Sequence, residues 1–285
     1  MGYPAMVNTC PPTPEEAASA GQRPFVELTD VSLTYGDFGE GLLALKDFNL
    51  SVRQGEFCAL VGPSGCGKST TLKLVSGLRQ PDAGGVIVAG KEVSKPLKIV
   101  GMAFQNPTLL PWRTSLDNVL LPLEIVEPHR RGFRKEKAQH VDRAMALFDK
   151  VGLKDVADRF PWQLSGGMQQ RVSLCRSLIH EPDLLLLDEP FGALDAFTRE
   201  DLWDTVKTLW QEQKFTTLLI THDLTESVYM AETVHVLSAR PGRVIHSQRI
   251  PEALRRTRED RFSPAFADAV YALRQHVGHA QEDPS

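Results

Sequence analysis

A glycine-rich segment at residues 62–69 constrains this 285-residue chain more than any other feature. It fits the pattern G-x-x-x-x-G-K-[S/T], in which glycines let several backbone N–H groups point into one concavity at the start of a helix. An apolar run, Phe57–Val61, leads into the segment, and a helical pattern with Leu72, Val75 and Leu78 follows it. This strand–loop–helix context predicts a phosphate-binding loop rather than a chance glycine-rich turn.

The chemistry of such a loop gives its residues distinct roles. Lys68 is expected to reach the outer phosphates of a nucleotide, and the hydroxyl of Ser69 to ligate magnesium. The candidate nucleotide-binding residues of this segment are Gly62, Pro63, Ser64, Gly65, Cys66, Gly67, Lys68, Ser69 and Thr70.

Two adjacent acids follow a second apolar run. Leu184–Leu187 ends in Asp188 and Glu189. A carboxylate here can hold magnesium, the role assigned to Asp188, and Glu189 is then placed to polarise an attacking water. Acids often end exposed strands, so this pair is informative because it shares a chain with the phosphate loop.

Short apolar runs and helical patterns alternate along the chain, which indicates a buried parallel sheet with helices on its faces. Alternation of apolar and polar residues predicts antiparallel strands at Phe25–Tyr35 and Ala44–Val52. The strand signal disappears between Pro107 and Ile179, so we predict an inserted helical subdomain there. Further strands are expected at Ile99–Phe104 and Thr217–Ile220, and a hairpin at Val234–Leu237 and Val244–Ile250.

Bulk composition excludes several classes of function. The formal net charge of −4 argues against a nucleic-acid-binding protein. No stretch approaches the roughly 18 to 20 apolar residues of a transmembrane helix, so work at a membrane requires membrane-spanning partners. The four cysteines lack metal-ligand spacing and are expected to be reduced thiols.

The segment Leu164–Arg171 reads Leu-Ser-Gly-Gly-Met-Gln-Gln-Arg. Ser165 can cap the helix that follows it. Gly166 and Gly167 leave the N–H groups of that helix start open to a phosphate, whereas an ordinary capped helix does not need two glycines. The apolar face of the helix is Met168, Val172, Cys175 and Ile179.

Together with the phosphate loop and the double acid, this segment resembles the signature of the ABC ATPase family. The resemblance implies an α/β phosphate-loop NTPase that hydrolyses ATP with Mg²⁺. Its core would be a mixed sheet, with an antiparallel β subdomain and a helical subdomain at about 107–179. The ABC ATPase domain is then expected at residues 25–249, between a disordered tail at 1–24 and a helical C-terminal extension at 250–285.

Further family motifs match single residues of this chain. By resemblance, Tyr35 stacks on adenine, Gln105 contacts magnesium and the attacking water, and His222 senses the terminal phosphate. Asp195 resembles the acid of a loop that crosses the dimer, although Gly192 stands where many members have serine. The signature residues expected to meet the ATP of a partner subunit are Ser165, Gly166, Gly167 and Gln169. The predicted catalytic residues are Glu189, His222 and Gln105, and the predicted metal ligands are Ser69, Gln105 and Asp188.

A narrower resemblance joins the chain to importer ATPases for nitrate, taurine and aliphatic sulfonates. It rests on Phe104–Pro107, Leu109–Trp112, Pro190–Asp195 and Leu237–Arg243. It implies a homodimer closed by ATP, bound peripherally at the cytoplasmic face of the inner membrane. Separate transmembrane permease subunits and an extracytoplasmic substrate-binding protein would complete the complex, with no nucleic acid.

Two surface expectations remain. We expect Leu109, Leu110 and Trp112 to form part of a docking groove for a membrane subunit, with packing inside the helical subdomain as the equal alternative. The mixed charge run Arg255–Arg261 is expected to be a solvated face. The helical stripe that follows it is Phe266, Val270 and Leu273.

Other classes of function stay open from the sequence. A soluble ABC ATPase without a membrane partner is one alternative, although relatives of that class usually carry two such domains or long coiled coils. The signature speaks against a phosphate-loop kinase or GTPase, and intact Glu189 and His222 speak against a regulator with little hydrolysis. The sequence specifies neither the transported substrate nor the direction of transport.

Overall fold

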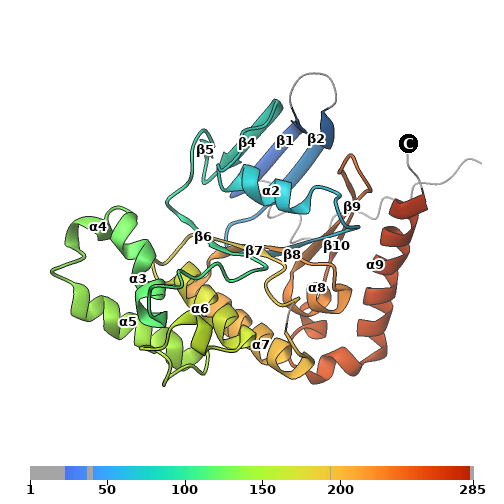
Figure 1. The fold of residues 1–285 in the computed structure, drawn as a ribbon. Helices are drawn as coiled ribbons and strands as arrows, with labels where there is room; N and C mark the ends of the chain where they lie inside the picture. The colour runs from blue at the N-terminus through green and yellow to red at the C-terminus, as the bar shows by residue number, and fades with distance from the viewer. Residues whose placement is uncertain (1–22, 37–40, 193, 283–285) are drawn as a thin grey trace, which may run out of the picture.

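Two sheets and a group of helices build the chain in this computed structural model, which describes residues 23–36, 41–192 and 194–282 (Figure 1). The larger sheet has six strands in the order β10-β9-β3-β8-β7-β6, and the smaller has four in the order β2-β1-β4-β5. The expected tail lies outside the described residues, apart from Arg23 and Pro24.

The six-stranded sheet is parallel except at one edge. Its strands are β3 (Phe57–Val61), β6 (Val100–Ala103), β7 (Leu184–Asp188), β8 (Thr216–Ile220), β9 (Thr233–Leu237) and β10 (Val244–Arg249). Only β10 runs antiparallel, to β9, which confirms the expected hairpin. Strands β3 and β8 are buried along their whole length, because helices cover both faces of a parallel sheet.

The four-stranded sheet is antiparallel and lies above the phosphate-loop helix in Figure 1. Its strands are β1 (Val26–Tyr35), β2 (Leu42–Val52), β4 (Ala83–Val88) and β5 (Lys91–Glu92). The first two were expected from alternation, but β4 and β5 were not predicted. Helix α2 (Lys68–Val75) packs its buried Leu72 and Leu74 into a core shared by both sheets. The phosphate loop is thus fixed between them.

Helices fill the segment in which no strand was expected. They are α3 (Ser115–Ile125), α4 (His129–Gly132), α5 (Lys137–Lys150) and α6 (Gly166–Leu178). Buried Val119 and Leu123 of α3, Phe148 of α5 and Val172 of α6 belong to one apolar core, together with residues of the sheet. The helical region therefore shares a hydrophobic core with the sheet and is not a separately packed unit.

The remaining α-helices of the described residues are α7 (Ala196–Gln213), the short α8 (Leu224–Met230) and α9 (Pro264–Glu282). Helix α9 runs along one side of the molecule next to β10 and α8 (Figure 1). Its Phe266 and Leu273 are buried and Val270 packs against the core, which confirms the expected stripe. Short 3-10 helices occupy Pro161–Gln163, Glu252–Leu254 and Glu259–Phe262.

The charge run Arg255–Arg261 is a solvated face only in part. Arg256 and Glu259 are exposed as expected, whereas Arg255 is buried and the Arg261 side chain is largely covered. Arg258 pairs with Asp201 at 2.7 Å, and Arg261 pairs with Glu200 at 2.9 Å. Both acids lie on α7, about 60 residues earlier in the chain. Helix α7 presents these acids to the arginines that precede α9, and the run ties the two elements together.

Candidate functional site

The phosphate loop connects the carboxyl end of β3 to the start of α2. Gly67 has φ +99°, and a Cβ there would lie 2.5 Å from Leu45 Cδ2, so no larger residue fits without a shift. Lys68 Nζ donates to the carbonyls of Gly62 and Pro63 at 2.8 Å each. The ammonium group is therefore held inside the loop, within reach of a phosphate bound there.

The other side chains of the loop differ in their access to solvent. Ser64 and Gly65 are exposed on its rim, whereas Cys66 is buried. Burial raises the pKa of the Cys66 thiol. The Cys66 thiol is therefore not placed to contact a ligand through its charged form.

Ser69 and Asp188 bring two oxygen ligands together. Ser69 Oγ donates to Asp188 Oδ1 at 3.0 Å. Burial raises the pKa of the Asp188 carboxyl, and this outweighs the hydrogen bond from Ser69, which lowers it. A hydroxyl and a carboxylate are the hard oxygen donors that Mg²⁺ prefers, and a cation would favour the charged form of this buried acid. These residues therefore fit the predicted Mg²⁺ site.

Glu189 meets both other predicted catalytic side chains. Gln105 Nε2 lies 3.5 Å from Glu189 Oε2, and His222 Nδ1 lies 3.2 Å from the same oxygen. Strands β6, β7 and β8 are parallel neighbours, so the residues that follow them emerge at one end of the sheet. The arrangement combines a carboxylate that can orient water with two polar side chains that can meet a phosphate.

Tyr35 ends β1 beside the phosphate-loop helix. Its hydroxyl lies 3.2 Å from Thr70 Oγ1, in the first turn of α2. The Arg79 guanidinium lies 5.3 Å from the centre of its ring, and the Lys73 ammonium 5.9 Å. An aromatic ring in this position suits a base carried next to loop-bound phosphates.

The signature segment starts α6 with its cap in place. Ser165 Oγ accepts the N–H of Met168 at 3.3 Å, as expected. Nothing lies within 4 Å of the position that a Cβ of Gly166 would take, so the helix start is open to an anion. Gln169, in contrast, bonds to its own chain: its Nε2 donates to the carbonyl of Pro161 at 3.0 Å. This hydrogen bond connects α6 to the short helix Pro161–Gln163 that precedes it.

A hollow of about 430 Å³ adjoins the signature and is lined also by Asp195 and Thr198. Asp195 caps α7 by accepting the Thr198 N–H at 3.0 Å, and this hydrogen bond lowers the pKa of the Asp195 carboxyl. Among the described residues that line the hollow, none belongs to the phosphate loop. One chain thus presents the signature and the phosphate loop as separate concavities.

Two polar residues that were not predicted lie between the Asp195 helix and the His222 loop, and one of them, Arg199, connects these segments. Arg199 Nη2 donates to the Leu194 carbonyl at 2.9 Å, and its Nη1 lies 3.5 Å from Asp223 Oδ2. Glu226 is buried nearby, and burial raises its pKa well above the usual range. Arg199 lies four residues after Asp195, and Glu226 lies four residues after His222, about one helical turn in each case. This spacing was the only signal in the sequence that could have identified them.

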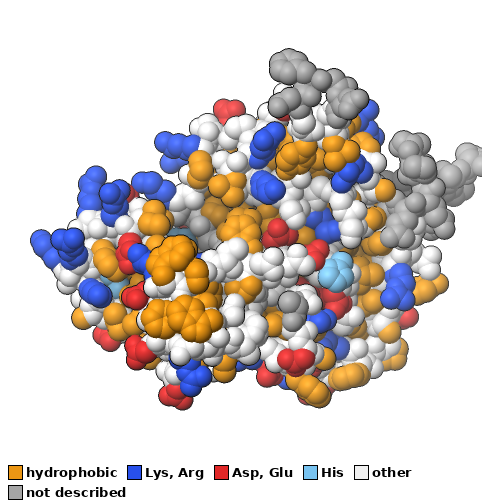
Figure 2. Space-filling view, viewed as in Figure 1, with side chains coloured by type: hydrophobic (Ala, Val, Ile, Leu, Met, Phe, Trp, Pro, Cys, Tyr) orange, Lys and Arg blue, Asp and Glu red, His pale blue; other side chains and the backbone are white. Residues whose placement is uncertain are grey.

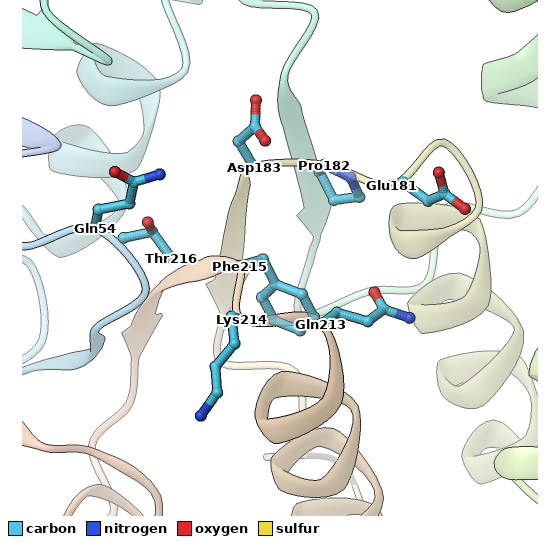
Figure 3. A pocket seen from close by; sticks show the side chains of 8 residues that line it. All are labelled: Gln54, Glu181, Pro182, Asp183, Gln213, Lys214, Phe215 and Thr216. Atoms are coloured by element: carbon cyan, nitrogen blue, oxygen red, sulfur yellow. The ribbon is translucent and has the colours of Figure 1, made fainter.

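Another hollow, of about 330 Å³, lies at the opposite end of the sheet (Figure 3). Pro182 and Asp183 line it just before β7, and Phe215 and Thr216 line it where β8 begins. Ligands of α/β sheets bind at the carboxyl ends of the strands, where Glu189 and His222 lie. The hollow in Figure 3 is therefore separate from the nucleotide site.

Known proteins are similar to this chain in sequence. The sequence model of the ABC transporter family matches residues 45–192. The taurine import ATP-binding protein TauB of Escherichia coli (strain K12) is 45% identical over 224 residues, which cover 79% of this chain and 84% of TauB. TauB of Shigella flexneri is 42% identical over 251 residues, which cover 88% of this chain and 95% of TauB.

A solved structure shares the fold. The dimeric ATP-binding cassette MJ0796, in a post-hydrolysis state bound to ADP and Pi, superposes with a TM-score of 0.68 at 32% identity. The match covers 79% of this chain and 99% of the cassette. In the part of the chain that the structure describes, no helix has both the length and the apolarity to cross a membrane. The sequence, the fold and the relatives agree that this chain belongs to the ABC transporter family and is an ATPase.

Proposed function

We propose that this chain powers the import of taurine, or of a closely related small sulfonate, across a membrane. The observation that carries this proposal is the 45% identity over 224 residues to proteins named for taurine import. Of the three substrates that resemblance left open, taurine is the one that these relatives favour.

ATP would be held from three sides within one chain. Backbone N–H groups of the phosphate loop and the Lys68 ammonium would bind the outer phosphates, and Tyr35 would stack on the base. Ser69 and Asp188, with Gln105 near them, are the residues that would hold Mg²⁺. When bound, the ion would supply positive charge that offsets the charge of the phosphates. No described group of three or more His, Cys, Asp or Glu side chains forms a separate metal site.

Hydrolysis would centre on Glu189. This carboxylate is placed to orient a water for attack on the terminal phosphate and to accept its proton. His222 and Gln105, both in contact with Glu189, would keep the carboxylate directed at that water and contact the phosphate.

A second subunit would complete each site. The open helix start at Ser165–Gly167 is separate from the phosphate loop of the same chain, so it is free to meet the ATP of a partner. The dimeric form of the related cassette supports this arrangement. ATP would close the dimer, with Asp195 in the crossing loop, and hydrolysis would release it.

A groove of about 280 Å³ supports docking of a transmembrane permease subunit. It runs between β6 and α3 and is lined by apolar side chains that include Met102, Leu121 and Ile125. Figure 2 shows that apolar side chains gather on this part of the surface. Trp112 is 71% exposed, whereas Leu109 packs against the core and neither lines the groove.

In this arrangement the chain sits peripherally on the cytoplasmic face of the inner membrane. The permease would bridge it to an extracytoplasmic substrate-binding protein. Coupling would come from the two states of the ATPase dimer, which bias the attached permease between its two conformations.

The test is to purify this chain with its co-purifying membrane subunits and reconstitute them in proteoliposomes. We expect ATP-dependent uptake of labelled taurine, and no uptake with Lys68→Ala. Uptake of nitrate in place of taurine would contradict the substrate. Recovery of the chain only without membrane subunits would contradict the transporter and favour a soluble ABC ATPase.

A further inference from the structure

The connection between β9 and β10, residues 238–243, packs against the phosphate loop. Arg240 Nε and Nη2 donate to the Gly65 carbonyl at 3.1 and 2.9 Å, across 175 residues of sequence. A Cβ at Gly242 would lie 2.0 Å from the Cys66 carbonyl oxygen. Two successive residues of the loop, Gly65 and Cys66, are thus held by one distant connection.

Carbonyl direction matters because a phosphate loop binds anions through its N–H groups. Where successive N–H groups converge on a phosphate, the carbonyls must point elsewhere and need partners of their own. Lys68 satisfies the carbonyls of Gly62 and Pro63, and Arg240 satisfies that of Gly65. Both donors are cations, so all four hydrogen bonds are charge-assisted.

Gly65 is a residue of the loop for which such a restraint matters. Its φ is +77°, and glycine populates many backbone conformations at similar free energy. The Arg240 guanidinium already occupies the space beside it, since a Cβ there would lie 2.8 Å from Arg240 Nη2. A planar guanidinium that donates two hydrogen bonds restrains a peptide group better than the flexible ammonium of a lysine does.

The connection is itself anchored on the other sheet. The Gly242 N–H donates to the Ala44 carbonyl of β2 at 2.9 Å, and the Lys46 N–H donates to the Gly242 carbonyl at 3.3 Å. Ser238 Oγ also donates to the Pro241 carbonyl at 3.0 Å. The guanidinium therefore projects from a backbone that is fixed on both sides.

We propose that Arg240 is a positioning residue for ATP: it sets the Gly65 peptide before the nucleotide arrives, so that less ordering remains to be done on binding. The inference rests on the proposed nucleotide site at residues 62–69. It assigns to the β9–β10 connection a role in nucleotide affinity and none in the chemical step.

The test compares Arg240→Ala and Arg240→Lys with a control from the same connection, Arg243→Ala. The Arg243 side chain pairs with Asp47 at 3.7 Å on the surface, so its loss should leave the phosphate loop unchanged. Amide hydrogen exchange of residues 62–70 is measured in the full chain without nucleotide, and KM and kcat for ATP are measured separately.

For Arg240→Ala we expect faster exchange in the loop and a KM raised about fivefold, with kcat within about twofold of wild type, as loss of an exposed charge-assisted bond predicts. Arg240→Lys should give exchange and KM values between those of wild type and Arg240→Ala, because one donor group replaces two.

Unchanged exchange and KM in both variants would overturn the proposal, as would an equal effect of Arg243→Ala. If Arg240→Ala does not fold, Arg240→Lys alone decides by the same two readouts. Equal ATP affinity of wild type and Lys68→Ala would instead overturn the nucleotide site, while the exchange data would still report on Arg240.

Discussion

His222 Nδ1 lies 3.2 Å from Glu189 Oε2, and Gln105 Nε2 approaches the same oxygen to 3.5 Å. One carboxylate oxygen is thus shared by side chains that follow two different strands, on either side of β7. Glu189 itself has φ +47°, an uncommon conformation for a residue with a side chain. The backbone and both neighbours together aim this carboxylate, so its chemistry depends on all three strand ends.

Glu189→Gln should keep ATP binding and lose hydrolysis. The amide retains the shape of the carboxylate but cannot accept a proton from water, so we expect kcat to fall by about 100-fold or more. Size-exclusion chromatography with ATP should then show an accumulated dimer, while wild type returns to monomer. Near-normal turnover would mean that a different residue organises the water.

Ser69→Ala should raise the Mg²⁺ concentration needed for half-maximal ATPase activity by about tenfold, because one oxygen ligand near Asp188 is lost. Ser69→Thr is the matched control, since it keeps the hydroxyl. The measurement is a Mg²⁺ titration at saturating ATP. An identical titration curve for Ser69→Ala would show that the contact between Ser69 and Asp188 is purely structural.

Glu226→Gln should stabilise the protein increasingly as pH rises. Burial raises the pKa of Glu226 in the fold, and the charges of Asp223 and Glu189 add to this while Thr221 and Arg199 oppose it. The folded state therefore keeps a proton that the unfolded chain loses above a pKa of about 4.5. Stability contributed by this group falls as pH rises from there, by up to about 1.4 kcal/mol per pH unit.

Glutamine never carries that charge, so the free energy of unfolding of Glu226→Gln minus that of wild type should grow between pH 5 and pH 8. Chemical denaturation at several pH values measures it, and groups common to both proteins cancel in the difference. A difference that does not change with pH would place Glu226 in contact with water.

Trp112→Ala should fold normally, because the indole is 71% exposed and adds little to the core. ATPase activity of the isolated chain should be unchanged, whereas co-purification with membrane subunits should weaken. Leu123→Ala is the contrasting variant, since Leu123 is fully buried and its loss should cost about 2–5 kcal/mol of stability. Full retention of the membrane subunits by Trp112→Ala would remove this residue from the docking surface.

Those parts of the site that are built from residues adjacent in sequence could be predicted from the sequence. The phosphate loop, the cap at Ser165 and the buried run before Asp188 are local patterns, and each lies in the predicted element. Strand β4 was missed because Gly84 and Gly85 interrupt its alternation, and its pairing with β1 supplies the missing order.

Contacts between distant segments could not be anticipated. Charge alone does not tell which arginines of 255–261 face the acids of α7, and nothing local marks Arg240 as a neighbour of Gly65. Gln169 is a related case: the sequence predicts that it meets the ATP of a partner subunit, and within this chain its amide donates to the Pro161 carbonyl. A sequence motif identifies candidate residues, but the residues that they contact depend on tertiary packing.

The order of strands in the larger sheet has a consequence during synthesis. Strand β3, which leads into the phosphate loop, pairs only with β8 and β9, and these begin at Thr216 and Thr233. The antiparallel sheet, in contrast, is complete once the ribosome has translated Glu92. A nascent chain therefore carries its phosphate loop on an unpaired apolar strand until most of the message has been read.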